Sequence, residues 1–254
     1  MTHTVLRLTV IAVFAAFAIG SPAAAGKQAG GGNDGQFAEA RKRMMEVIQA
    51  HASAIDSKTL DSRISKPVLE AMAQVPRHAL VPEEQRDAAY EDRPLPIGYG
   101  QTISQPFIVA LMTDLLRIEP GDKVLEVGTG SGYQAAVLAE LGAEVYTIEI
   151  VPELGRRAAR RLDRIGYGGV EERIGDGYYG WKAHAPYDAI VVTAAANHIP
   201  PPLARQLKPG GRMVIPVGGP FMVQQLVLVV RREDGSIRTR QLHPVSFVPL
   251  VRSL

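Results

Sequence analysis

Acidic and glycine residues gather in EVGTGSG, which runs from Glu126 to Gly132 and has glycine at every second position from Gly128. The stretch follows the β-rich run KVLEV and precedes YQAAVLAEL, whose composition favours a helix. Glycines allow the backbone to turn sharply and approach a ligand, and the start of the helix offers free N–H groups. The sequence therefore predicts a ligand-binding loop between a strand and a helix. A dinucleotide fingerprint would need its third glycine where Tyr133 stands, which argues against a nicotinamide-dependent dehydrogenase.

Two further acidic residues follow β-rich runs along the chain. Glu149 lies near the end of EVYTIEI (144–150), and Asp176 with Gly177 follows the weaker run VEERI (170–174). Open α/β sheets bind ligands at the carboxyl ends of their strands, where a carboxylate can accept hydrogen bonds from both hydroxyls of a ribose. A plain turn with a solvated charge is the alternative. The coincidence of three strand ends favours a ribose-containing ligand over it.

The stretch GYGQTISQP (98–106) precedes an apolar run, FIVALMTDLL, whose spacing is helical. Its glycines and proline indicate a turn. Ser104 stands where a helix N-cap would, and a cap is the interpretation that the residues alone favour. The other interpretation is a hydroxyl presented to a ligand.

Strands and helices alternate from residue 122 to residue 217, and YDAIVVT (187–193) is a strongly apolar strand among them. This alternation predicts an α/β fold with a doubly wound, mostly parallel sheet. The C-terminal third has no helix between QQLVLVVRRE and SIRTRQLHPV, and Asp234-Gly235 between them predicts a hairpin of antiparallel edge strands. Ahead of the sheet we expect helices over 37–51 and 66–74, followed by a mostly irregular segment.

Charge and cysteine content exclude several classes of function. The 254 residues carry a formal net charge of +2 and no cysteine, so no strong field attracts nucleic acid, and disulfides and a thiolate nucleophile are excluded. The histidines are scattered without metal-ligand spacing, and no metal is expected. Arginines between residues 156 and 164 form a basic helical face, for which a solvated surface is favoured over contact with RNA phosphates.

The first 25 residues have the layout of a secretory signal peptide. Arg7 precedes an apolar run from Leu8 to Ile19, and three alanines at 23–25 give a cleavage pattern. Residues 26–36 have the composition of a flexible linker, and residues 37–254 are expected to form one domain, with a helical and irregular part (37–106) and a sheet core (107–254). These features predict an exported, periplasmic protein with no stable membrane association after cleavage. An uncleaved anchor, or a wrongly chosen start codon on a cytoplasmic protein, is the alternative.

The motifs together resemble those of the protein-L-isoaspartate O-methyltransferases, S-adenosylmethionine-dependent class I enzymes with a Rossmann-like sheet. The combination of GYGQTISQP with YDAIVVTAAA is specific to this family. The resemblance implies a monomer that methylates the free α-carboxylate of L-isoaspartyl residues in damaged proteins and peptides, with S-adenosylmethionine as methyl donor. The matching stretches run in the family's order over residues 67–254: VPRHALVP, PLPIGYGQTISQP, VLEVGTGSGYQAAVLA, GDG, APYDAIVVTAAA, QLKPGGRMVIPVG and FVPL.

The resemblance also implies roles for individual residues. The hydroxyl of Ser104 would donate a hydrogen bond that orients the acceptor carboxylate, which is ionised at neutral pH and needs no general base. Alignment of the reacting atoms and exclusion of water are then the enzyme's tasks. Within the donor site, Glu126 and the glycine loop would hold the methionine part, Glu149 the ribose, and Asp176 with Gly177 the adenine. The expected donor-binding residues are Thr102, Ile103, Glu126, Gly128, Thr129, Gly130, Gly132, Glu149, Asp176 and Gly177. The residues expected beside the peptide are Ser104, Thr193, Ala194, Ala195 and Ala196.

Two alternatives stay open. A methyltransferase for RNA or a small molecule would share the donor site, but the chain has TAAA after its fourth strand in place of an N/D-P-P-Y-type motif. A non-catalytic module that binds S-adenosylmethionine would share the fold, and the presence of Ser104 argues against it.

Overall fold

The computed structural model describes residues 35–55, 63–219 and 222–252. The predicted signal peptide (1–25) and nearly all of the predicted linker (26–36) therefore lie outside the described residues. The last two linker residues belong to a 3-10 turn, Gly35–Phe37, that leads into helix α1 (Ala38–Ala54). None of the helices in the described ranges has the length and apolar character that crossing a membrane requires.

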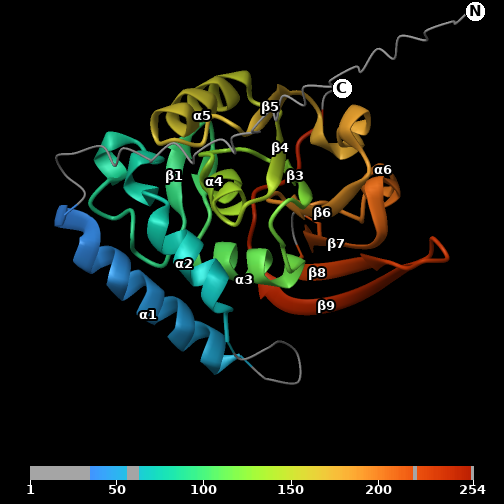
Figure 1. Cartoon of the computed structure of the whole chain (residues 1–254), viewed down its shortest axis with the longest axis horizontal. Coiled ribbons are helices and arrows are strands. Elements are labelled where there is room, and N and C mark those ends of the chain that lie inside the picture. Colours follow the sequence, from blue (N-terminus) through green and yellow to red (C-terminus); the bar gives the residue numbers. More distant parts are fainter. Residues whose placement is uncertain (1–34, 56–62, 220–221, 253–254) are drawn as a thin grey trace, which may run out of the picture.

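The described residues form a seven-stranded sheet in the order β5-β4-β3-β6-β7-β8-β9 (Figure 1). Neighbouring strands from β5 to β7 run parallel, whereas β8 and β9 are antiparallel to their neighbours. The predicted doubly wound sheet with antiparallel C-terminal edge strands is thus confirmed. The strands are β3 (Lys123–Val127), β4 (Glu144–Glu149), β5 (Glu171–Ile174), β6 (Tyr187–Val192), β7 (Leu207–Val217), β8 (Gln224–Arg231) and β9 (Ile237–Val245).

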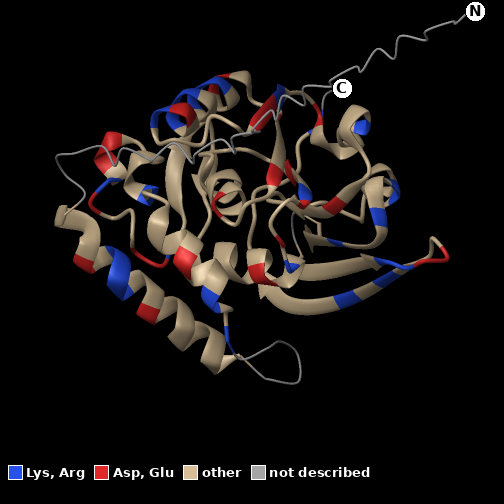
Figure 2. Ribbon diagram, in the orientation of Figure 1, with Lys and Arg blue, Asp and Glu red and all other residues tan. Residues whose placement is uncertain are grey.

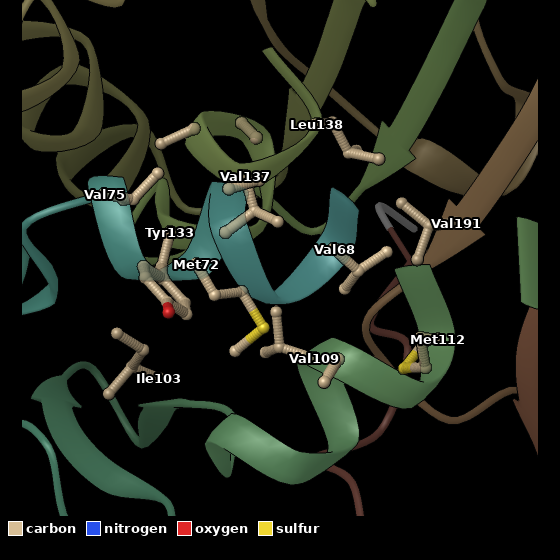
Figure 3. Close-up of a cluster of buried hydrophobic side chains, with 14 of the residues drawn as sticks. Val68, Met72, Val75, Ile103, Val109, Met112, Tyr133, Val137, Leu138 and Val191 are labelled. Atoms are coloured by element: carbon tan, nitrogen blue, oxygen red, sulfur yellow. The ribbon is translucent and has the colours of Figure 1, made fainter. Parts of the chain in front are cut away.

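Successive side chains of a strand point to opposite sides of the sheet. The central strands are buried on both sides, because each side of the sheet has its own core cluster. Val124 of β3 belongs to a core cluster shared with helices α1 to α5, whereas its neighbour Leu125 belongs to a second cluster with α6. Figure 3 draws part of the first cluster, to which Met72 of α2 (Lys66–Gln74), Val109 of α3 and Val137 of α4 belong. The helices that flank the sheet are α3 (Pro106–Leu116), α4 (Tyr133–Glu140), α5 (Pro152–Arg164) and α6 (Pro201–Gln206).

The N-terminal part holds helices α1 (Ala38–Ala54) and α2 (Lys66–Gln74), close to the predicted ranges. It also contains a hairpin of β1 (Leu95–Gly98) and β2 (Gln101–Ile103), where the sequence predicted an irregular segment and a turn. Leu95 and Ile103 pair across this hairpin, and both side chains are buried in the core. Burial against the helices thus stabilises strands that are too short and proline-rich to be recognised from local sequence.

The basic face of α5 partly contradicts the expected solvated surface. Arg157 donates to the carbonyl oxygen of Ile97 at 3.2 Å. Arg161 donates to those of Leu80 and Val81 at 2.9 and 3.1 Å. Figure 2 shows the arginines as blue segments along α5, beside the N-terminal part. At least two of them therefore attach the N-terminal part to the sheet core.

Candidate functional site

A cavity opens at the carboxyl ends of the parallel strands. Strands β4 and β5 lie to one side of β3, and β6 and β7 lie to the other, so the chain reverses its direction of travel across the sheet between β3 and β6. Open α/β sheets bind ligands at such a switch point. The cavity is lined by residues 101–104, Val109, residues 126–131, Tyr133, Gln134, residues 148–150, Gly177, Thr193, Ala194 and residues 248–251.

The glycine loop after β3 has the tight backbone that the sequence predicted. Gly128 has φ of +101°, and a Cβ atom there would lie 2.4 Å from the hydroxyl oxygen of Thr193. That hydroxyl donates to the carbonyl oxygens of Val127 and Gly128, at 3.1 and 2.7 Å. The end of β6 therefore fixes the loop at a position where glycine is required.

Glu149 is held with its carboxylate against this loop. Its Oε2 accepts a hydrogen bond from the backbone N–H of Gly130 at 2.8 Å, and its Oε1 accepts one from Val151 at 2.9 Å. The residue is 6 % exposed and lines the cavity. Each carboxylate oxygen has a second lone pair, so the group can still accept bonds from the hydroxyls of a ligand.

Glu126 is completely buried beneath the cavity. Its Oε2 accepts a hydrogen bond from the Thr147 hydroxyl at 2.6 Å, whereas among the described residues its Oε1 has no partner. Burial, reinforced by the charges of Glu149 and Glu172, raises the pKa of Glu126 to about 8. A buried carboxylate oxygen without a partner is costly, and a cationic or hydrogen-bond-donating ligand would satisfy it.

The side chains of Thr129 and Asp176 form hydrogen bonds within the protein. The hydroxyl of Thr129 lies 2.6 Å from that of Thr147 and shares a hydrogen bond with it. Asp176 accepts a bond from the backbone N–H of Tyr178 at 2.9 Å and so begins the 3-10 turn Gly177–Tyr179. Gly177 lines the cavity, and Asp176 is not among the lining residues. Its role beside an adenine stays a prediction.

The cap interpretation of Ser104 is wrong. Helix α3 begins at Pro106 with Gln105 as its N-cap, and no side chain of that residue caps the helix. The carbonyl oxygen of Ser104 accepts a bond from the Arg77 guanidinium at 2.7 Å. Within the part of the chain that the structure describes, the Ser104 hydroxyl has no hydrogen-bond partner, and it lines the cavity. The hydroxyl is therefore available to a ligand.

A second cleft, of about 680 Å³, meets the first cavity at Ser104. Both spaces are lined by Thr102, Ser104, Thr193 and Val248. Among the described residues that line the cleft, His51 and His243 are the ones with ionisable side chains. The other lining residues are Ala54, Ile55, Pro94, Gln105, Phe107, Ile108, Pro244, Val245, Ser246 and Phe247.

The expected peptide-binding residues after β6 divide into two pairs. Thr193 and Ala194 line the cavity, whereas Ala195 and Ala196 do not. The N–H of Ala195 donates to Val248 at 2.8 Å, and its carbonyl oxygen accepts from Leu250 at 2.7 Å. The backbone of Ala195 is thus paired with the C-terminal segment, and its contact with a peptide stays a prediction.

Sequence reasoning also missed two residues beside Ser104. Arg77 bonds the carbonyl oxygen of Ser104 and Asp92 bonds the N–H of Phe107, and nothing in their local sequence indicated these roles. The histidines at 51 and 243 were counted as scattered, although helix α1 and strand β9 bring both to the cleft.

Comparisons with known proteins match the chain to one family. The family model described as Protein-L-isoaspartate(D-aspartate) O-methyltransferase (PCMT) matches residues 53–254. A relative from Polaromonas sp. named protein-L-isoaspartate O-methyltransferase 2 is 63% identical over 207 residues, which cover 82% of this chain and 98% of the relative. One from Cupriavidus necator, named protein-L-isoaspartate O-methyltransferase 1, is 61% identical over 218 residues, or 86% of this chain and 84% of the relative.

Solved structures agree in fold. One titled protein-L-isoaspartate O-methyltransferase has a TM-score of 0.71 and 27% identity, and the similarity covers 82% of this chain and 65% of that one. Another, from Plasmodium falciparum, is titled as a putative enzyme of this name in complex with S-adenosyl-L-homocysteine. It has a TM-score of 0.70 and 24% identity, covers 84% of this chain and 99% of that one, and so supports the fold alone.

Proposed function

Since the chain belongs to the protein-L-isoaspartate(D-aspartate) O-methyltransferase family, we propose that it moves a methyl group from S-adenosylmethionine to the α-carboxylate of L-isoaspartyl residues in damaged proteins. The observation that carries this proposal is the meeting of two spaces at Ser104. The cavity at the strand ends is the donor site, and the cleft between α1 and the C-terminal segment is the acceptor site. The two substrates would then react where the spaces join.

The donor site suits S-adenosylmethionine in its chemistry. Glu149 would accept the ribose hydroxyls, and the unpartnered Oε1 of Glu126 would face the α-ammonium group of the methionine part. Gly177 lines the wall where the adenine is expected. When bound, the donor supplies an electrophilic methyl group on a sulfonium.

At the junction, Ser104 would orient the acceptor. Its hydroxyl would donate one hydrogen bond to the isoaspartyl carboxylate, leaving the other oxygen directed at the methyl carbon. No proton has to be removed, because the carboxylate is already ionised at neutral pH. An isoaspartyl linkage displaces the α-carboxylate relative to an ordinary aspartyl residue, and a small displacement costs the in-line geometry. We therefore expect ordinary aspartyl peptides to be very poor substrates and D-aspartyl peptides weak ones.

An RNA substrate is the weaker proposal. The cleft beside Ser104 is lined largely by apolar and uncharged side chains, and lysine and arginine are missing from its described lining. RNA binding depends on cationic contacts to phosphates. The lining therefore supports a peptide acceptor.

The test is direct. The purified protein is offered matched isoaspartyl and aspartyl peptides and an RNA with methyl-labelled donor. We expect label on the isoaspartyl peptide, as a base-labile ester. Equal labelling of the two peptides, or label on RNA alone, would contradict the proposal.

We further propose that the protein is exported, on the strength of the N-terminal sequence alone. Mass spectrometry of the native N-terminus tests this. A mature chain that begins near residue 26 is expected, and a chain that retains Met1 would show that the segment is not cleaved.

A further inference from the structure

The backbone around Ser104 is fixed from both sides by charged residues. On one side, Arg77 is fully buried and donates from Nη2 to the carbonyl oxygen of Ser104 at 2.7 Å. Its Nε donates to the carbonyl oxygen of Ala89 at 2.7 Å, and its guanidinium lies over the ring of Tyr133. Arg77 therefore has little freedom to move, and the carbonyl group of Ser104 shares that rigidity.

On the other side, one carboxylate bonds the residues that follow Ser104. Oδ1 of Asp92 accepts a bond from the backbone N–H of Phe107 at 2.8 Å. Oδ2 accepts one from the side-chain amide of Gln105 at 2.9 Å, and it lies 2.7 Å from Nδ1 of His51 on helix α1. The side chain of Asp92 is 6 % exposed, so its carboxylate is largely shielded from solvent.

The bonds of Asp92 explain why the Ser104 hydroxyl is not needed to cap helix α3. The first turn of α3 contains N–H groups that need an acceptor, and from its place in the sequence Ser104 could have been that acceptor. Asp92 bonds the N–H of Phe107 from 15 residues away, and its negative charge also suits the N-terminal end of a helix. Asp92 therefore caps the helix, and the Ser104 hydroxyl is free to donate to the acceptor carboxylate.

We propose that Asp92 is a positioning residue for methyl transfer, which holds residues 105–107 so that the Ser104 hydroxyl points at the junction of the two spaces. This inference rests on the proposed function. Asp92 is not among the residues that line either space, so it acts through Ser104 and not by contact with substrate. A loop that is free to shift by about 1 Å would lose a large part of the alignment on which the rate depends.

The experiment compares Asp92→Ala with Asp92→Asn, each with and without Ser104→Ala. We expect Asp92→Ala to lower kcat about tenfold or more at saturating substrates, because the loop loses its anchor. Affinity for S-adenosylhomocysteine, measured by calorimetry, should stay within about twofold, since Asp92 lies outside the donor cavity. Asp92→Asn keeps one oxygen for the Phe107 N–H and should retain kcat within about threefold.

The double variant gives the decisive readout. If Asp92 acts through the serine, Asp92→Ala should have almost no effect on kcat in the Ser104→Ala background. Asp188 provides the matched control: its carboxylate also accepts a backbone N–H, that of Lys123 at 2.9 Å, at the opposite ends of the strands. Asp188→Ala should lower the melting temperature without changing kcat per folded molecule.

Several results would overturn the proposal. They are a wild-type kcat in Asp92→Ala, an equal loss of kcat with and without Ser104, or an equal loss in Asp188→Ala. If Asp92→Ala does not fold, Asp92→Glu keeps the charge but lengthens the side chain by one methylene, which should shift residues 105–107 and lower kcat; an unchanged kcat there would have the same meaning. A wild-type protein with no isoaspartyl activity would instead overturn the proposed function itself.

Discussion

Replacement of Glu126 by glutamine is expected to uncouple donor binding from a proton. Glu126 is buried with its Oε1 unpartnered, and burial raises its pKa to about 8. In the donor-free protein at pH 7 the carboxyl group is therefore mostly protonated. If the α-ammonium group of the donor binds the carboxylate, that proton must leave on binding.

The size of the effect follows from the pKa. With a pKa of about 8, ionisation at pH 7 costs about 1.4 kcal/mol, and binding should release about 0.9 proton per site. The ionised fraction rises about 25-fold between pH 6.5 and pH 8.5. The ratio of wild-type to Glu126→Gln affinity should rise by about the same factor, because the titration of the ligand's own amine is common to both proteins.

The assay is calorimetric titration with S-adenosylhomocysteine in two buffers of different ionisation enthalpy. The difference in observed heat gives the protons released. We expect about 0.9 proton at pH 7 for the wild type and close to none for Glu126→Gln.

Thermal stability offers a second readout. A carboxyl whose pKa is higher in the folded state than in the unfolded state binds more protons when folded, so the free energy of unfolding falls as pH rises between the two pKa values. The contribution of Glu126 should fall between about pH 4.5 and 8, so the free energy of unfolding of the donor-free wild type should decrease relative to that of Glu126→Gln over this range. Equal proton release in both proteins, or a constant affinity ratio across pH, would refute the reasoning.

Three other changes test the site. Glu149→Ala removes the proposed ribose acceptor and the partner of the Gly130 N–H, so calorimetry should show at least tenfold weaker binding of the donor product, from about 1.5–3 kcal/mol per charged hydrogen bond. Unchanged affinity would contradict the ribose proposal. Gly128→Ala should lower the free energy of unfolding by about 2–4 kcal/mol, because φ is positive there and the new methyl group would displace the Thr193 hydroxyl. Gly130→Ala, whose methyl group would meet nothing closer than 3.6 Å, should lower it less in the same denaturant titration, and equal losses would contradict the steric argument. Ala195→Leu should impair donor binding as well as peptide turnover, because the buried Ala195 pairs with the C-terminal segment that lines the proposed donor cavity. An effect confined to the KM for the peptide would instead support the expectation that Ala195 lies beside the peptide.

The local sequence was sufficient to predict which residues surround the proposed donor cavity. The glycine loop and Gly177 follow strands, Glu149 ends a strand, and parallel strands present their carboxyl ends at one edge of the sheet. The order of strands and helices is therefore sufficient to predict that these residues surround one cavity. The N-terminal helices and the C-terminal hairpin were also predictable, because their periodicity and turn residues are local properties.

The hairpin ahead of Ser104 could not be predicted in the same way. Its strands are four and three residues long, and its proline and glycine content indicates a turn. Burial of Leu95 and Ile103 against helices from distant parts of the chain stabilises it. Propensity is a weak guide where tertiary burial decides the conformation.

The acceptor half depends most on tertiary structure. From the sequence, Ser104 was a candidate either for capping α3 or for contact with the substrate, and spacing favoured the cap. The structure excludes the cap, because Asp92 bonds the first turn of the helix from 15 residues away. The backbone of Ala195 was expected to meet a peptide, and the C-terminal segment pairs with it instead. The sequence by itself determined which residue types stand at the strand ends, since that depends on neighbours along the chain. Which of their hydrogen-bonding groups stay free depends on partners that only folding brings together.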